Sequence, residues 1–211
     1  MKILCFTNIL AGLSVSIVEE DKEKFNNLLD FYTSDGNQIK NIPFILETVK
    51  KVEKIENIDS IFVTTGPGYF TTIRITCLIA QTISFLLKKE LLFIDSFSAL
   101  KNVFNFVYKN FNGKPIPNEQ IYLIKIASKR YRLKHNEIDL EITSLEEVTN
   151  LAKKENIKII FNNLNQKEIE FFKKEKVDFV DLSNIYRAGT VYLSSKDDLK
   201  KSPDYNLKIN Y

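Results

Sequence analysis

Few residues of the sequence have types that could do chemistry. His135 is the only histidine, and its polar neighbours Lys134 and Asn136 predict a solvated turn residue, because connecting segments run over protein surfaces. Cys5 and Cys77 have apolar neighbours, which favours buried thiols over a nucleophile. A metallopeptidase needs a paired-histidine motif, which one histidine cannot supply. We therefore predict no catalytic residue, no cofactor-binding residue and no metal ligand.

A turn containing two glycines stands between an apolar strand and an apolar helix. Gly66 and Gly68 permit backbone conformations that other residues resist, and Pro67 stiffens the turn between them. A turn that opens a helix either holds an anion on free N–H groups or is a tight connection without a ligand. Neither a lysine–serine pair after the glycines nor a GxGxxG pattern is present, so the residues alone favour the tight connection.

Two basic features leave alternatives open. Residues 128–134 (SKRYRLK) contain a single aromatic residue, Tyr131, and form either a contact for nucleic-acid phosphates or a solvated hairpin face, which we favour. Arg74 falls in the first turn of a predicted helix, where the helix dipole disfavours a cation. It pairs either with a nearby carboxylate or with a partner molecule.

The composition is that of an ordinary globular protein. The 211 residues are 44% hydrophobic and 27% charged, and 30 basic against 27 acidic groups leave a net charge of +3. That charge is too small for binding nucleic acid by charge alone, and two cysteines exclude a disulfide framework. The first ten residues lack a signal-peptide pattern, and the most apolar stretch, 73–87, contains Arg74 and Gln81. We expect a cytoplasmic protein that does not span a membrane.

Hydrophobic periodicity predicts alternating strands and helices in both halves of the chain. The predicted strands are 2–7, 13–18, 27–32, 60–65, 91–94, 121–127, 131–134, 140–142, 158–161 and 177–180. The predicted helices are 42–52, 71–88, 96–108, 144–154, 166–174 and 182–193. A turn at 34–37 and a linker at 110–118 are rich in turn residues. We therefore predict an α/β protein with an N-terminal lobe, 1–110, and a smaller C-terminal lobe, 118–211.

The predicted helix 71–88 has two apolar sides. One stripe contains Ile75, Ile79, Ile83 and Leu86, and the other contains Ile73, Cys77, Ala80, Ser84 and Leu87, which are mostly small. A helix with two such stripes is buried on both sides. One side must pack on its own sheet, and the small-residue side either contacts the helix at 42–52 or belongs to an interface with a partner.

Three ordered segments resemble the bacterial TsaB family, formerly called YeaZ. Residues 3–17 read ILCFTNILAGLSVSI, residues 63–75 read VTTGPGYFTTIRI, and residues 90–100 read ELLFIDSFSAL. Members of the family typically show ILAIDTS, then GPGSFTGLRIG, then a strand ending in GVSSLEAL. The resemblance is close over 59–100, fair over 1–20 and looser to the end. There, 121–132 (IYLIKIASKRYR) and 202–208 (SPDYNLK) are similar to family segments.

The resemblance implies a fold and a role. The fold is two-lobed and actin-like or sugar-kinase-like, with ribonuclease-H-type lobes whose mixed sheets are flanked by helices. The role is that of a non-catalytic partner of TsaD. Together with a TsaE-type ATPase, that complex installs threonylcarbamoyl on the adenosine beside the anticodon of tRNA. TsaD carries the metal and the chemistry, and tRNA is contacted only through the complex.

The implied partner surface lies on the two helices of the N-terminal lobe, about 38–54 and 71–88, and the same surface is implied for a homodimer. The predicted interface residues are Ile42, Ile45, Leu46, Val49, Tyr69, Ile73, Cys77, Ala80 and Ser84. Gly66, Pro67 and Gly68 are the predicted structural turn.

The sequence also departs from the family pattern. The aspartate of DTS is replaced by Thr7, and actin-like ATPases use a carboxylate there to position metal and phosphate. Its loss agrees with a non-enzymatic role. Three family glycines are Thr72, Thr76 and Thr82, and the motif serine is Tyr69. The helix contact is therefore either looser than in relatives or repacked against a co-adapted partner.

Two other functions stay open at this point. An ATP-dependent small-molecule kinase of the same superfold would bind nucleotide between the lobes, although the missing aspartate argues against it. A homodimeric structural protein without a part in tRNA modification would use the same two helices.

Overall fold

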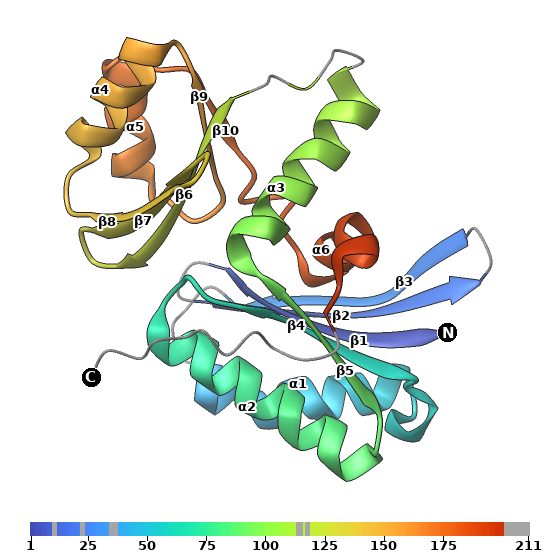
Figure 1. Cartoon of the computed structure of the whole chain (residues 1–211). Helices are drawn as coiled ribbons and strands as arrows, with labels where there is room; N and C mark the ends of the chain where they lie inside the picture. The colour runs from blue at the N-terminus through green and yellow to red at the C-terminus, as the bar shows by residue number, and fades with distance from the viewer. Residues whose placement is uncertain (10–11, 22–23, 34–37, 113–115, 117–118, 201–211) are drawn as a thin grey trace.

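Each half of the chain builds a mixed sheet, as the computed structural model in Figure 1 shows. Each of the two sheets has five strands. The structure describes residues 1–9, 12–21, 24–33, 38–112, 116 and 119–200. The strands of the first sheet are β1 (Lys2–Ile9), β2 (Gly12–Asp21), β3 (Lys24–Thr33), β4 (Ser60–Thr65) and β5 (Glu90–Asp95). Their order is β3-β2-β1-β4-β5. The first three strands by sequence are antiparallel neighbours, whereas β4 and β5 run parallel to β1.

The second sheet repeats this connectivity. Its strands are β6 (Gln120–Ala127), β7 (Arg130–His135), β8 (Ile138–Ile142), β9 (Lys158–Phe161) and β10 (Phe179–Asp181). The order β10-β9-β6-β7-β8, taken from the β8 edge, is that of the first sheet. Again three antiparallel strands are followed by two parallel ones. The predicted two-lobed α/β architecture with mixed sheets flanked by helices is confirmed.

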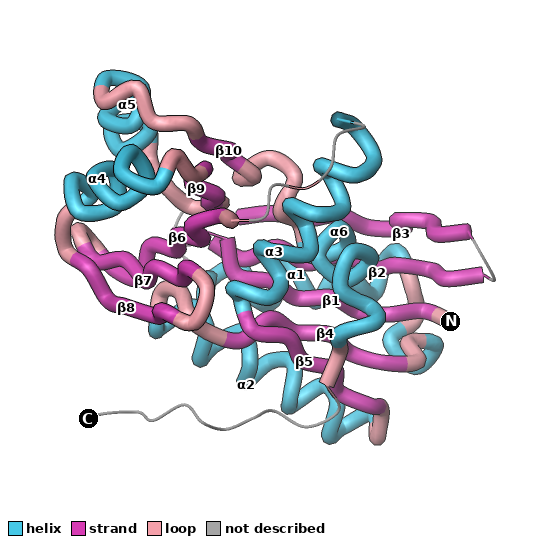
Figure 2. Tube along the Cα trace, turned by 45° about the horizontal axis from the view of Figure 1, so that its top comes forward, coloured by secondary structure: helices cyan, strands magenta, loops and turns pink. Residues whose placement is uncertain are grey.

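Helices cover both faces of the first sheet, so its central strands β1 and β4 are buried at nearly every position whose burial the structure describes. Helices α1 (Gln38–Val52) and α2 (Phe70–Leu87) cover one face, where Leu4 and Phe6 of β1 point. Ile3 and Cys5 point to the other face, which α3 (Ser96–Val107) and α6 (Ala188–Ser195) cover. Figure 2 shows α1 and α2 together on one side of the strands. The short helix Ile55–Asn57 leads into β4.

The second sheet shares a core with the first through α3. Its outer face packs against α4 (Leu145–Glu155) and α5 (Gln166–Lys174), where Ile121 and Leu123 are fully buried. Tyr122 and Ile124 point the other way and join the cluster that contains α3 and α6. That cluster therefore connects the lobes as one continuous core.

The last helix differs from its prediction. Residues 182–187 are not part of it, and α6 begins only at Ala188, after the extended Arg187. Moreover, α6 packs on β1 and β2, so the chain after residue 118 contributes to both lobes. Residues 110–112, at the start of the predicted linker, belong to a five-residue π-helix, Tyr108–Asn112. The predicted turn at 34–37, most of the rest of the linker and the segment 202–208 lie outside the described residues.

Candidate partner-binding surface

The glycine turn fixes where α2 begins. The Gly66 carbonyl accepts a hydrogen bond from the Ser96 N–H at 3.2 Å, so the turn is tied to the start of α3. A Cβ added at Gly68 would lie 3.0 Å from Cδ1 of Ile73, which is tighter than nine in ten real Cβ contacts. The Ile73 N–H in turn donates to the Tyr69 carbonyl at 3.0 Å. Gly68 therefore suits the close approach of turn and helix, and the turn is a tight connection from β4 to α2.

The inner side of α2 packs on the first sheet. Its buried residues are Thr72, Thr76, Ala80 and Ile83. The Thr76 hydroxyl donates to the Thr72 carbonyl at 2.8 Å, so burial leaves it satisfied. Thr82 is exposed and its hydroxyl donates to the Leu78 carbonyl at 2.7 Å. Two of the three threonines that replace family glycines thus belong to the core of the chain itself.

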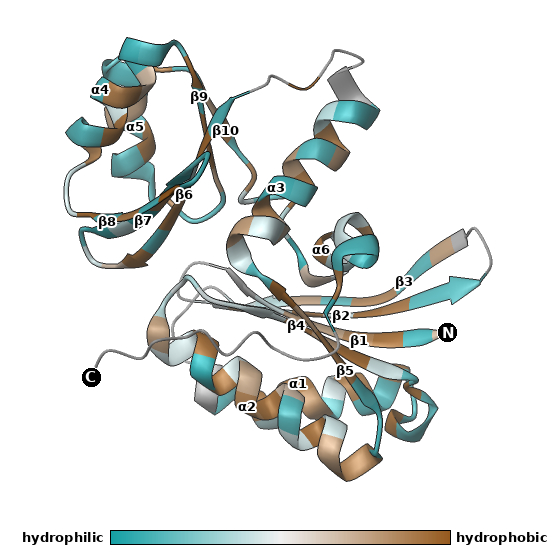
Figure 3. Ribbon diagram, in the orientation of Figure 1, coloured by the Kyte–Doolittle hydropathy of each residue, from teal (hydrophilic) through white to brown (hydrophobic). Residues whose placement is uncertain are grey.

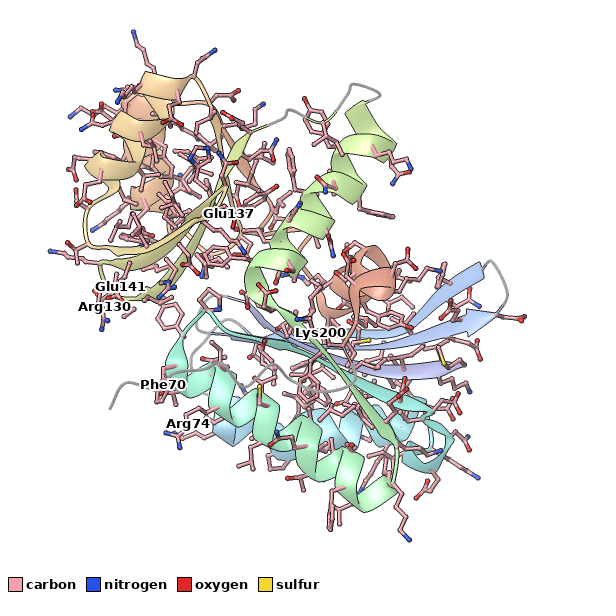
Figure 4. The ribbon with its side chains drawn as sticks, in the orientation of Figure 1. Phe70, Arg74, Arg130, Glu137, Glu141 and Lys200 are labelled. Carbon is pink, nitrogen blue, oxygen red and sulfur yellow. The ribbon has the colours of Figure 1, made fainter. Side chains whose placement is uncertain are left out.

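The opposite side of α2 is exposed, and large apolar residues stand there between polar ones such as Arg74 and Thr82. It carries Phe70, Leu78, Phe85 and Leu86, and we call these four residues the outer apolar face. Leu78 is 64% exposed and Phe85 is 82% exposed. The Arg74 guanidinium lies 5.1 Å from the Phe70 ring centre, and both residues stand at the start of α2 (Figure 4). Figure 3 shows hydrophobic residues along α2 and the neighbouring α1, where Phe44 is exposed too.

Three of the predicted interface residues are wrong as partner contacts. Ile45, Val49 and Ala80 are essentially fully buried in the core between the helices and the sheet. The other predicted interface residues are half-buried, and their contact with a partner stays a prediction. They are Ile42, Leu46, Tyr69, Ile73, Cys77 and Ser84. The residues missed were most of the outer apolar face. The prediction that α2 is buried on both sides is wrong, because Leu78 and Phe85 are exposed. The side that faces the sheet combines Ile83 of one predicted stripe with Ala80 of the other.

The carboxyl ends of β1 and β4 hold hydroxyl groups where a phosphotransferase needs carboxylates. The Thr7 and Thr64 hydroxyl oxygens lie 2.8 Å apart, and both residues are fully buried. The buried Tyr186 hydroxyl is hydrogen-bonded to Thr7. Burial raises the pKa of Tyr186, so its hydroxyl keeps its proton. This arrangement offers neutral hydroxyls, which lack the charge with which carboxylates bind Mg²⁺.

Both thiols are protected from ionisation. Burial alone raises the pKa of Cys5 well above its usual range and that of Cys77 to about 11. Cys5 is buried as predicted, whereas Cys77 is half-buried. Neither thiol has the low pKa that an activated nucleophile requires.

Two of the four basic residues in the cluster at 128–134 form ion pairs. Arg130 pairs with Glu141, and Arg132 lies 2.6 Å from the Asp139 carboxylate. Figure 4 shows Arg130 and Glu141 side by side at the edge of the second sheet. These ion pairs support the favoured interpretation, a solvated hairpin face.

The prediction for His135 is wrong. The residue ends β7 and is only 5% exposed, because α4 covers this corner of the sheet and its terminal Glu155 lies beside the imidazole. The polar neighbours of His135 in the sequence do not reveal that a helix from further along the chain covers it.

Among the described residues, α2 is the one helix long and apolar enough to suit a membrane span. Its inner side packs on β4 and β1, so its hydropathy reflects a core face combined with the outer apolar face.

Comparisons with solved structures gave distant similarities. YeaZ from Pseudomonas aeruginosa is 15% identical with a TM-score of 0.49, covering 67% of this chain and 69% of that chain. A Bacteroides thetaiotaomicron protein with an actin-like ATPase fold and unknown function is 10% identical with a TM-score of 0.48, covering 88% and 94%. The Aquifex aeolicus member of the Ppx/GppA family is 9% identical with a TM-score of 0.41, covering 92% and 88%. No curated protein matches the sequence.

The family comparison covers most of the chain. Residues 37–188 match the family model described as TsaD: tRNA N6-adenosine threonylcarbamoyltransferase. This segment runs from α1 to the start of α6 and includes the glycine turn, the outer apolar face and the second sheet. The recognition of a TsaB-type (YeaZ) protein from its sequence is thereby confirmed, and the chain belongs to the TsaD family.

Proposed function

We propose that the chain is a non-catalytic partner of a TsaD-type enzyme in the synthesis of threonylcarbamoyladenosine in tRNA. The observation that carries the proposal is the outer apolar face of α2. Large apolar side chains gathered on one exposed helix face are typical of a surface that another protein covers. Phe70 and Phe85 supply the aromatic anchors that dominate such interfaces.

The non-catalytic part of the proposal rests on the strand ends. Thr7 and Thr64 bond to each other where actin-like phosphotransferases hold metal and phosphate with carboxylates. The same pair weighs against the alternative, an ATP-dependent small-molecule kinase. The chain therefore contributes shape and apolar surface, and the partner contributes the reacting groups.

The proposed assembly has several members. A TsaD homologue binds α1 and α2, a TsaE-type ATPase joins the complex, and tRNA is contacted through the complex in the cytoplasm. Without the enzyme, two copies of this chain cover the outer apolar face as a homodimer. Both contacts use one surface and therefore compete.

The test compares two exposed phenylalanines on different helices. Phe85→Glu puts a charge in the outer apolar face, whereas Phe106→Glu puts the same charge on α3, where Phe106 is 41% exposed. We expect Phe85→Glu to weaken binding to the purified TsaD homologue of the same organism at least 100-fold by calorimetry, because the charge is desolvated on association. Phe106→Glu should change the affinity by less than about threefold.

Unchanged binding of the Phe85→Glu variant would show that the surface is wrong. Depletion of the protein in cells, followed by nucleoside analysis of tRNA, tests the role itself. A fall in threonylcarbamoyladenosine is expected, and normal levels would favour a homodimer without a part in tRNA modification.

A further inference from the structure

Three element ends meet at one corner of the second lobe. Glu119 directly precedes β6, His135 is the last residue of β7, and Glu155 is the last residue of α4. One ligand atom of each side chain, an imidazole nitrogen or a carboxylate oxygen, lies within 4.8 Å of the others. No short sequence motif indicates this group of three residues, because the fold brings together positions that are distant in the sequence.

The imidazole is buried and directed at the carboxylates without a hydrogen bond to them. His135 is 5% exposed, and its Nδ1 lies 3.7 Å from Oε2 of Glu155, which is longer than a hydrogen bond. An ion between the imidazole and the carboxylates would bond directly to all three groups, at shorter distances than the contact between His135 and Glu155.

The imidazole is the basic group that faces the two carboxylates. Within the described part of the chain, neither Glu119 nor Glu155 forms an ion pair with a lysine or arginine, although the sequence contains 30 such residues. Two carboxylates around one imidazole repel each other unless a cation lies between them. A divalent ion matches their combined charge.

We propose that Glu119, His135 and Glu155 bind a divalent transition-metal ion, with Zn²⁺ preferred. Zn²⁺ binds imidazole and carboxylate at about 2.0–2.2 Å in tetrahedral sites, which separates neighbouring ligand atoms by about 3.4 Å. The 3.7 Å between Nδ1 and Oε2 is close to that value, and both glutamates are exposed and able to turn inward. The imidazole ligand selects Zn²⁺ over Mg²⁺ and Ca²⁺. A water molecule completes the fourth position.

Asn136 supplies a partner for the other ring nitrogen. Its side-chain Nδ2 lies 3.3 Å from Nε2 of His135. When Nδ1 binds the metal, Nε2 carries the proton, and a turned Asn136 amide presents its Oδ1 as acceptor. The ion holds the ends of β6, β7 and α4 together, so it stabilises the folded second lobe.

The test uses the full-length protein without a polyhistidine tag, treated with chelator and then titrated with Zn²⁺ alone. We expect calorimetry to show one site with a dissociation constant of about 10 µM or tighter, and Zn²⁺ to raise the melting temperature. Glu119→Gln or Glu155→Gln should weaken binding at least tenfold, and His135→Gln should abolish it. Mg²⁺ at the same concentration should not bind.

The matched control is Glu137→Gln, which removes an exposed carboxylate from the same hairpin (Figure 4). It should leave Zn²⁺ affinity unchanged, and circular dichroism should show that every variant is folded. Absence of binding at 100 µM Zn²⁺ would overturn the proposal, because His135 would then only form an ion pair. Equal binding by the wild type and both glutamate variants would overturn it as well.

Discussion

The buried ion pair of Lys125 and Glu168 shows how single polar groups organise the second lobe. Their charged atoms lie 2.7 Å apart, and the Tyr131 hydroxyl donates to the same carboxylate oxygen at 2.5 Å. Burial and the neighbouring Glu168 raise the pKa of Tyr131, which keeps that donor protonated. The Asn163 side chain bonds to both backbone groups of Lys125 at 2.8 Å, where β6 leaves its regular pairing with β7.

The first prediction concerns this pair. Glu168→Gln keeps one acceptor oxygen for Tyr131, but it removes the oxygen that accepts from the Asn165 N–H in the cap of α5 and leaves the Lys125 charge without its counterion. We expect the free energy of unfolding, measured in urea, to fall by about 3 kcal/mol. The control Glu175→Gln breaks the more exposed pair with Lys153 and should cost less than about 1 kcal/mol. Equal effects would mean that burial does not strengthen the Lys125 pair.

The second prediction concerns Cys77, studied in a Cys5→Ala background so that one thiol reports. With a pKa of about 11, roughly one thiol in a thousand is ionised at pH 8, about 100-fold less than for an ordinary thiol. Because the thiolate reacts, we expect a disulfide reagent to modify native protein about 100-fold more slowly than urea-unfolded protein. The native rate should rise about tenfold per pH unit from pH 8 to 10. Similar native and unfolded rates would contradict the raised pKa.

At the scale of elements, the two sides of α2 have different roles. Thr76 and Ala80 face the sheet, whereas Leu78 and Phe85 face outward on the same 18-residue helix. The helix is thus held by the core on one side, and its other side is available to a second molecule. Substitutions at Leu78 and Ala80, only two positions apart, therefore distinguish an effect on association from an effect on stability.

The third prediction uses that contrast. Ala80→Arg inserts a charge where Ala80 has no exposed surface, so we expect the free energy of unfolding to fall by more than about 4 kcal/mol. Leu78→Arg should change it by less than about 0.5 kcal/mol, because the side chain stays in water. Urea unfolding followed by circular dichroism measures both. Comparable losses in the two variants would place Leu78 in the core as well.

At the scale of the whole molecule, the C-terminal helix completes the N-terminal lobe. The first N–H groups of α6, at Ala188 and Gly189, donate to the hydroxyls of Ser14 and Ser16 in β2 at 3.1 and 3.0 Å. The buried Tyr192 ring lies 5.5 Å from that of Phe62 in β4. The first sheet therefore depends on a segment that comes after the whole second sheet.

The fourth prediction follows from this dependence. A fragment of residues 1–118 lacks α6, so one face of its sheet is left partly uncovered. We expect the fragment to show no cooperative thermal transition, and mixing it with residues 119–211 should restore one. A fragment that melts cooperatively at the temperature of the full chain would show that the predicted N-terminal lobe, 1–110, folds independently.

Local patterns alone were enough to predict most elements of the fold. The predicted limits of β4, β9 and α5 equal the observed ones, because alternating or helical apolar spacing ends there at turn residues. The glycine turn and the family resemblance were equally local, since they depend on short ordered runs around Gly66 and Gly68. Local signals of this kind require no knowledge of distant contacts.

The order of strands and helices, the glycine turn and the family could therefore be predicted from the residues alone. Tertiary packing was needed to show which residues of α2 face the sheet, that Ile45 and Val49 lie in the core, and that His135 is buried beside Glu155. It also decided that α6 closes the first lobe. The reason is physical: periodicity shows how many sides of a helix are apolar, whereas burial depends on what packs there from elsewhere in the chain.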